Sequence, residues 1–153
     1  MTNSNSPKAI DPRQPRVGQA ITGTVLAFGF IAGWPQVLPA IAVVLGVVLL
    51  AGPFSPYVYA YGAVKRVLGW NPPPELEEAA PPRFATLLGF VFTSLAAILY
   101  YPVDAHIAGW ALGVLVAALA LLAATTGLCV GCEFYVFARR ILAARRARAE
   151  LSA

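Results

Sequence analysis

The chain has 153 residues, of which 59% are hydrophobic and only 12% are charged, with a formal net charge of +4. Soluble domains carry about 25% charged residues, and the apolar residues here form long runs instead of amphipathic stripes. This composition argues against a soluble globular domain and predicts an integral membrane protein.

Residues 1–16 are polar and rich in proline, and we predict that they form a flexible tail ahead of the first membrane segment. No short apolar region with a small-residue cleavage site follows them, so we expect no removable signal peptide. The first hydrophobic segment should therefore remain as an anchor.

Four segments have the length of a transmembrane helix, which needs about 20 apolar residues. They cover about residues 17–34, 36–52, 84–101 and 106–128. Pro35 separates the first two and Pro102 the last two. The predicted fold is an all-α membrane protein, with a four-helix transmembrane domain over residues 17–142 and a basic tail over residues 143–153.

All eleven basic residues fall on one side of these spans. They are Lys8, Arg13, Arg16, Lys65, Arg66, Arg83, Arg139, Arg140, Arg145, Arg146 and Arg148. The turns at Pro35 and Pro102 contain none. The positive-inside rule therefore places both termini in the cytoplasm, and the expected location is the cell inner membrane, as a multi-pass protein.

The two halves of the chain resemble each other. At an offset of 67 residues, Pro15-Arg16 aligns with Pro82-Arg83. At an offset of 74 residues, Lys65-Arg66 aligns with Arg139-Arg140. This internal repeat predicts two helical hairpins related by an axis along the membrane normal. Each hairpin would end in a helix at the cytoplasmic interface.

The stretch GLCVGCEFY holds both cysteines, Cys129 and Cys132. The longer offset aligns Cys129 with Ser55, which begins a Ser-Pro helix-start signal. We therefore predict a break near Gly127 that places Cys129 at a helix N-terminus, where the dipole and nearby arginines lower a thiol pKa. In an unbroken helix the pair would instead lie near a C-terminus, where a thiolate is disfavoured.

The candidate catalytic residues are Cys129 as the more reactive thiol, Cys132 as the resolving thiol, and Glu133. An ionisable side chain at the edge of a span is costly, so we expect Glu133 to orient groups or exchange protons. The alternative is an interfacial carboxylate paired with Arg139 or Arg140. Three further basic residues would stabilise the thiolate or bind an anion such as a sulfur oxyanion: Arg13, Arg16 and Arg83.

Three motifs together resemble a known family. They are Asp11-Pro12-Arg13 with Arg16, Pro82-Arg83-Phe84-Ala85, and LCVGCEFY at residues 128–135. From about residue 9 to 142, the chain is similar to the bacterial family of small integral membrane proteins catalogued as domain of unknown function 4395. The resemblance implies thiol or sulfur chemistry, because such proteins are associated with thioredoxin-like or sulfurtransferase proteins.

We therefore predict thiol–disulfide or persulfide exchange with a cytoplasmic thioredoxin-like or sulfurtransferase partner. One alternative is a non-catalytic scaffold or assembly subunit whose cysteines only pack between helices. Another is a small transporter of an anion or sulfur compound, which would require a homo-oligomer. The lipid bilayer is an expected partner, and nucleic acid is not.

We expect no cofactor and no metal. A structural zinc site usually needs four Cys or His ligands, and the single histidine, His106, falls on the outer side of the predicted membrane. Two cysteines therefore complete such a site only across a dimer.

Overall fold

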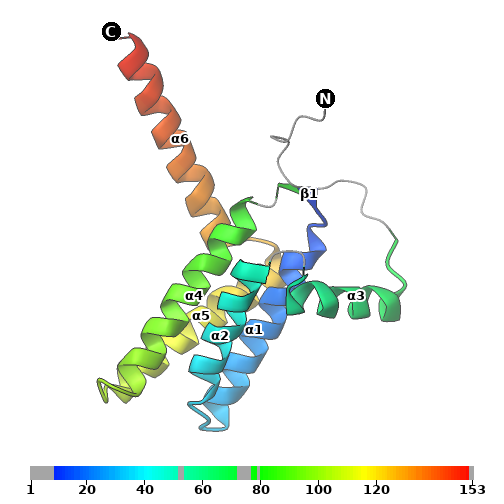
Figure 1. Cartoon of the computed structure of the whole chain (residues 1–153), viewed down its shortest axis with the longest axis vertical. Coiled ribbons are helices and arrows are strands. Elements are labelled where there is room, and N and C mark those ends of the chain that lie inside the picture. The colour runs from blue at the N-terminus through cyan, green and yellow to red at the C-terminus, as the bar shows by residue number, and fades with distance from the viewer. Residues whose placement is uncertain (1–8, 52–53, 72–76, 79, 152–153) are drawn as a thin grey trace.

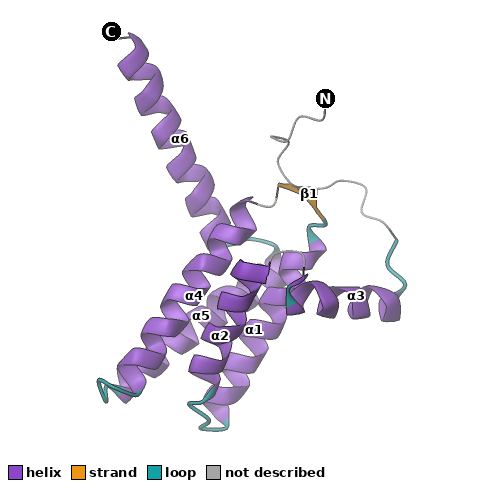
Figure 2. Cartoon of the chain, viewed as in Figure 1, coloured by secondary structure: helices purple, strands orange, loops and turns teal. Residues whose placement is uncertain are grey.

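The computed structural model describes residues 9–51, 54–71, 77–78 and 80–151. Within them, six helices are formed: α1 (Arg13–Ile31), α2 (Val37–Ala51), α3 (Pro56–Leu68), α4 (Ala80–Tyr100), α5 (His106–Thr126) and α6 (Val130–Leu151). Two two-residue strands, β1 (Ala9–Ile10) and β2 (Glu77–Glu78), pair antiparallel. The predicted helical class is confirmed (Figure 2). Residues 1–8 of the predicted tail, with Lys8, and Gly52 of the second predicted span lie outside the described residues.

Four of the helices form a bundle. Helix α1 packs against α5, α2 packs against α4, and α4 also packs against α5 (Figure 1). The start of α1 and the end of α6 lie at one end of the molecule, and the turns at residues 32–36 and 101–105 lie at the other. Helix α3 leaves α2 at an angle of 90°, and α6 extends beyond the bundle.

The core joins all four bundle helices. Its buried members are Leu26, Leu38, Ile41, Leu45, Ala96, Val116 and Ala117. A close approach between α4 and α5 is made at Gly109, where a Cβ would lie 2.9 Å from the backbone oxygen of Ala96. Small residues at such crossings are typical of helix packing in membranes, where close van der Waals contact replaces the hydrophobic driving force.

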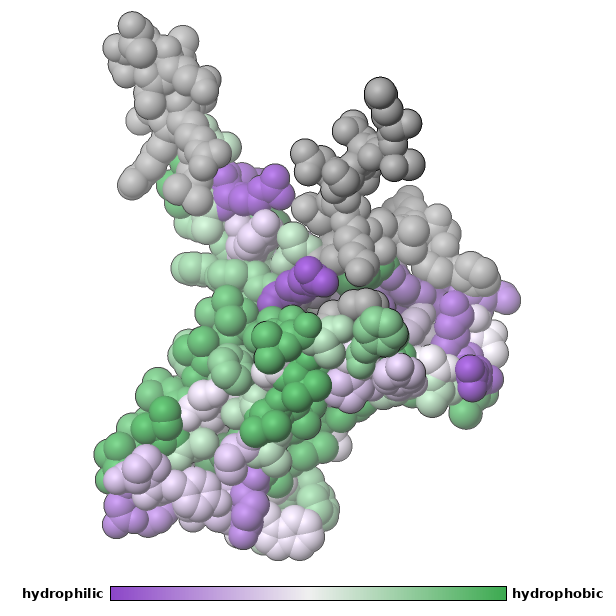
Figure 3. Space-filling model, in the orientation of Figure 1, coloured by the Kyte–Doolittle hydropathy of each residue, from purple (hydrophilic) through white to green (hydrophobic). Residues whose placement is uncertain are grey.

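Helices α4 and α5 are each long and apolar enough to cross a membrane. At 1.5 Å per residue, each spans about 32 Å, which matches a hydrocarbon core of about 30 Å. Helix α2 is shorter, and it reaches a comparable apolar length only together with α3, across their bend. An apolar belt covers the bundle, with polar residues at both ends (Figure 3). The structure therefore supports a helical membrane protein.

Three helix boundaries differ from the segments drawn from the sequence. Helix α1 begins at Arg13 because Asp11 caps it: the Arg13 N–H donates to Asp11 Oδ1 at 3.0 Å. Helix α4 begins at Ala80 and holds two prolines in its first turn, where their missing N–H groups need no partner. Helix α6 runs without interruption to Leu151, so its backbone shows no boundary at residue 142.

Candidate thiol site

The last two helices are separated by a glycine turn. Gly127 has a φ of +76°, which favours glycine, and its N–H donates to the Ala123 oxygen at 3.0 Å. Helix α6 then begins at Val130. A Cβ on Gly127 would lie 2.6 Å from Arg16 Nη2, so the Arg16 guanidinium, which comes from α1, packs directly against the turn. The break predicted near Gly127 is confirmed.

This turn over residues 127–129, the thiol turn, places Cys129 at the N-terminus of α6. The Cys129 carbonyl accepts the first bond of the helix, from the Glu133 N–H at 3.0 Å. Backbone N–H groups of Gly131 and Cys132 donate to the Cys129 sulfur. The first N–H groups of a helix have no partner within the helix. The Cys129 sulfur accepts hydrogen bonds from two of them, as the side-chain oxygen of a capping residue usually does. Cys132 follows one turn later, and both thiols are reduced and half-buried.

The hydrogen bonds lower the pKa of Cys129 from an ordinary 9.0 to about 6. The largest cause is the hydrogen bond from the Cys132 side chain, and burial opposes it. Smaller contributions come from the N–H groups of Cys132 and Gly131 and from the Gln19 side chain. At neutral pH, Cys129 is therefore mostly a thiolate, which is the nucleophilic form of cysteine.

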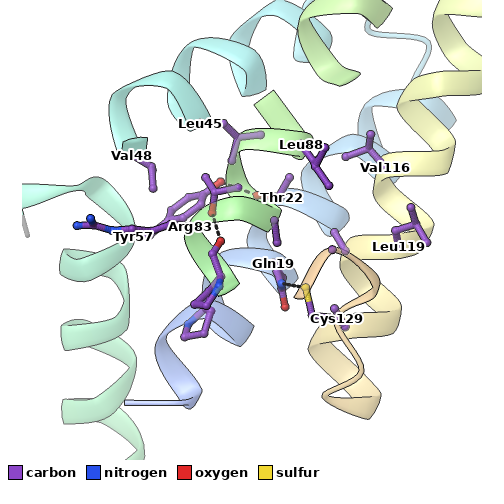
Figure 4. Close-up of a pocket in the computed structure, with 18 of the residues that line it drawn as sticks. Gln19, Thr22, Leu45, Val48, Tyr57, Arg83, Leu88, Val116, Leu119 and Cys129 are labelled. Atoms are coloured by element: carbon purple, nitrogen blue, oxygen red, sulfur yellow. Dashed lines mark hydrogen bonds between the residues drawn. The ribbon is translucent and has the colours of Figure 1, made fainter. Parts of the chain in front are cut away.

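Gln19 is a functional contact that the sequence analysis missed. Its Nε2 atom donates to Cys129 Sγ at 3.4 Å, and the two side chains point toward each other (Figure 4). An isolated amide belongs to no recognisable motif. The available signal was its polarity near one end of a predicted span, where a polar side chain usually has a partner.

The three candidate arginines separate into two groups. The Arg16 guanidinium lies against Gly127, two residues before Cys129. Arg83 is exposed and lines the same cavity as Cys129. Arg13 instead lies over the ring of Trp70, 5.1 Å from its centroid, at the end of α3. The structure thus brings Arg16 to the thiol segment, Arg83 to the cavity that Cys129 also lines, and Arg13 to α3.

Two of the sequence motifs pack against each other where α4 meets α6. A Cβ on Gly131 would lie 3.0 Å from the Ala85 Cβ, and the rings of Phe84 and Tyr135 are 5.6 Å apart. Glu133 lies exposed in the first turn of α6, where a carboxylate is favoured by the helix dipole. Packing therefore explains two residues of each motif, and Glu133 is exposed to solvent.

A cavity of about 610 Å³ opens next to Cys129. All six helices contribute to its wall. Leu45, Leu88 and Val116 lie on the side away from the Gln19–Cys129 pair (Figure 4). Polar side chains that also line the cavity are Gln14, Gln19, Thr22, Ser55, Tyr57, Arg83 and Thr86. The thiolate therefore faces a partly open, mostly apolar space.

In the part of the chain that the structure describes, no three His, Cys, Asp or Glu side chains gather. His106 lies at the other end of the bundle, with its Nε2 atom 3.2 Å from Asp104 Oδ1. The chemistry that the site offers is that of a thiol pair.

Comparison with known proteins identifies a family and no activity. No curated protein and no solved structure matches the chain. The family described as "Domain of unknown function (DUF4395)" matches residues 10–140, which include all three sequence motifs and every residue of the thiol site. The chain therefore belongs to the DUF4395 family.

Proposed function

We propose that this protein is a membrane dithiol that exchanges electrons with partner thiols through Cys129 and Cys132. The observation that supports this function is the position of Cys129 at the start of α6, where it accepts hydrogen bonds from Cys132, from backbone N–H groups and from Gln19. A thiolate with a second thiol one turn away is the arrangement that thiol–disulfide exchange requires.

The exchange runs in two steps. The Cys129 thiolate attacks one sulfur of a partner disulfide, whose S–S bond breaks, and the leaving thiolate takes up a proton. Cys132 then loses its proton and attacks the Cys129 sulfur, which forms the Cys129–Cys132 disulfide and releases the second partner thiol. The pair has lost two electrons and the partner has gained two. The reverse sequence oxidises a partner dithiol.

In this function the charged side chains around the turn guide the partner. Arg16, which closes the Gly127 turn, and Arg83, which lines the cavity, would attract the anionic thiolate of a partner. Exposed Glu133, in the first turn of α6 with Cys132, would accept or return the Cys132 proton. Arg13 would act indirectly, by holding the start of α1 against α3 through Trp70.

We also propose that α1 and α2 cross the membrane with α4 and α5, and that both termini lie in the cytoplasm of a bacterial cell. The support is that α1 and α2 lie in the same bundle as α4 and α5. The apolar parts of α1 and α2 are short, and local thinning of the bilayer accommodates such spans at a modest cost. Cytoplasmic termini would place the thiol turn within reach of soluble thioredoxin-like proteins.

The proposed internal repeat is supported by helix pairing. Helix α1 contacts α3 and α5, and helix α4 contacts α6 and α2. These are equivalent neighbours if the second half repeats the first. The contact of Gly18 with Tyr57 in the first half has its counterpart in the contact of Ala85 with Gly131. Those pairs correspond at the same offsets of 67 and 74 residues.

Trapping of a mixed disulfide tests the function. Inverted vesicles, which expose the cytoplasmic face, are treated with a small aromatic disulfide and a membrane-impermeant maleimide. In Cys132→Ser the adduct on Cys129 should persist, whereas the wild type should release it and resist the maleimide. The Cys129→Ser variant should form no adduct. Labelling of Cys129 only after denaturation would instead support the scaffold function, in which both cysteines serve packing.

A further inference from the structure

We propose that the cavity beside Cys129 binds an isoprenoid quinone, whose ring accepts the two electrons of the Cys129–Cys132 pair. This inference rests on the proposed dithiol function and identifies its electron acceptor. It is carried by the shape and lining of the cavity, by the position of the sulfur within it, and by the groups around that sulfur.

The cavity has the size and lining of a site for an apolar ligand. Its volume of about 610 Å³ lies within the usual range of ligand cavities, about 300–1,000 Å³. The wall away from the thiol is made of aliphatic side chains from three helices: Leu45 and Val48 of α2, Leu88 of α4, and Val116 of α5. That wall suits a hydrocarbon chain and offers a charged cytoplasmic metabolite no partner.

Hydrogen-bond donors also line the cavity. Gln19 contacts Cys129 Sγ from within it and Gln14 lines it, and Arg83 lines it beside Tyr57, on the side away from the sulfur (Figure 4). Amide and guanidinium N–H groups are the donors that ring carbonyl oxygens need. A ligand with a polar carbonyl ring and an apolar tail therefore matches both ends of the space.

The position of Cys129 favours an acceptor that comes from the membrane. The sulfur is half-buried and lines the cavity, and helices α4 and α5, whose lengths fit a bilayer, form much of the wall. Phe92 and Leu119 line the cavity and are also 38% and 39% exposed, so the space is not sealed by either helix. A phospholipid tail would fit the apolar part but would leave the thiol pair without an oxidant.

The electron balance is complete with a quinone alone. The Cys129 thiolate adds to a ring carbon, and a ring oxygen takes a proton from water. Cys132 loses its proton and attacks the Cys129 sulfur. The carbon–sulfur bond breaks with its electron pair left on the ring, and the second ring oxygen is protonated. One dithiol becomes one disulfide, and one quinone becomes one quinol.

The same hydrogen bonds favour this direction. Contacts that stabilise the Cys129 thiolate stabilise the reduced pair, which makes the disulfide a stronger oxidant of partner dithiols. A pair of that kind needs an acceptor of still higher potential to be reoxidised, and a quinone meets that requirement. The protein would thus pass electrons from partner thiols into the membrane quinone pool.

The test uses the full-length reduced protein in lipid nanodiscs. The probes are a benzoquinone that carries prenyl units, the same ring without a tail, and a small aromatic disulfide. Quinone absorbance and disulfide content are followed together. Ala120→Trp fills the cavity from α5, and Leu88→Phe is a milder filling from α4. Leu115→Trp is the matched control, because Leu115 is exposed on α5 and does not line the cavity.

We expect one quinol for each disulfide formed, and prenylated quinone to react about tenfold faster than the bare ring. Both cavity-filling variants should lose that advantage while keeping wild-type reactivity toward the aromatic disulfide, and Leu115→Trp should behave as wild type. Equal rates for the two quinones, or a bound lipid that quinone does not displace, would overturn the quinone site alone. Failure of Cys129 to react with the aromatic disulfide would overturn the dithiol function itself.

Discussion

The Gln19 side chain of α1 donates a hydrogen bond to Cys129 Sγ at the start of α6, across 110 residues of sequence. The Arg16 guanidinium, from the first turn of the same helix, lies against Gly127. Helix α1 therefore holds the thiol turn at two points, one at the sulfur and one at the backbone that positions it. Reactivity at Cys129 should depend on α1 as much as on the cysteine motif.

Loss of the Gln19 amide should raise the pKa of Cys129. In Gln19→Leu the sulfur loses one donor and keeps the larger contribution of Cys132, so the alkylation rate at about pH 6 should fall about three- to tenfold. Gln19→Glu should slow the reaction further, because a carboxylate disfavours a neighbouring thiolate. Gln36→Leu, in the turn at the other end of the bundle, is the control. An unchanged iodoacetamide rate in Gln19→Leu would show that the contact does not tune the thiol.

The alkylation of the wild-type protein should follow the Cys129 thiolate with pH. Because the pKa is lowered from 9.0 to about 6, the rate should rise through about pH 6 and level off near neutrality. A midpoint near the ordinary cysteine pKa of 9.0 would contradict this expectation. Measurement on Cys132→Ala should show a midpoint shifted upward, since that variant removes the side-chain donor that is the largest cause of the lowered pKa.

The lowered pKa of Cys129 also makes the stability of the reduced protein depend on pH. The folded pKa of about 6 lies below the ordinary 9.0, so unfolding takes up a proton at pH values between the two. The stabilising contribution of Cys129 is therefore complete above about pH 9 and is lost as the pH falls toward about 6. Thermal unfolding of wild type and Cys129→Ser should diverge with rising pH over this range. Parallel curves would contradict the shift.

Replacement of Gly127 by alanine should destabilise the thiol turn by more than the cost of an alanine in the left-handed backbone region. The left-handed backbone costs an alanine about 1–2 kcal/mol, and the Cβ would also displace Arg16. Gly69→Ala isolates the first effect, because Gly69 has a φ of +59° and nothing within 4 Å of its Cβ position. Gly127→Ala should therefore lower the melting temperature further than Gly69→Ala and should slow alkylation of Cys129. Equal effects of the two substitutions would show that Arg16 does not stabilise the turn.

The sequence predicted the features that depend on local signals. Hydropathy runs located the helices, and alignment of Cys129 with Ser55 predicted the break that Gly127 makes. The contacts of Gln19 and Arg16 depend on which helices pack together, and α1 packs on α5 instead of mainly on its sequence neighbour α2. Because the apolar helices have similar compositions, their sequences do not indicate which of them pack together. The cavity was missed for the same reason, since its wall combines all six helices.

The contact between α4 and α6 should tolerate an exchange of its two small residues. Gly131→Ala places a Cβ 3.0 Å from the Ala85 Cβ, which is closer than van der Waals contact, so α6 must move and the thiol turn with it. We expect a lower melting temperature and slower alkylation of Cys129. Adding Ala85→Gly should restore the melting temperature and the alkylation rate. The methyl group of the new alanine at position 131 then occupies the space that the Ala85 methyl group left. The matched control is Gly62→Ala, on α3, where a Cβ meets nothing within 4 Å. If the double variant recovers stability but not the alkylation rate, the position of α6 against α4 does not set the reactivity of Cys129.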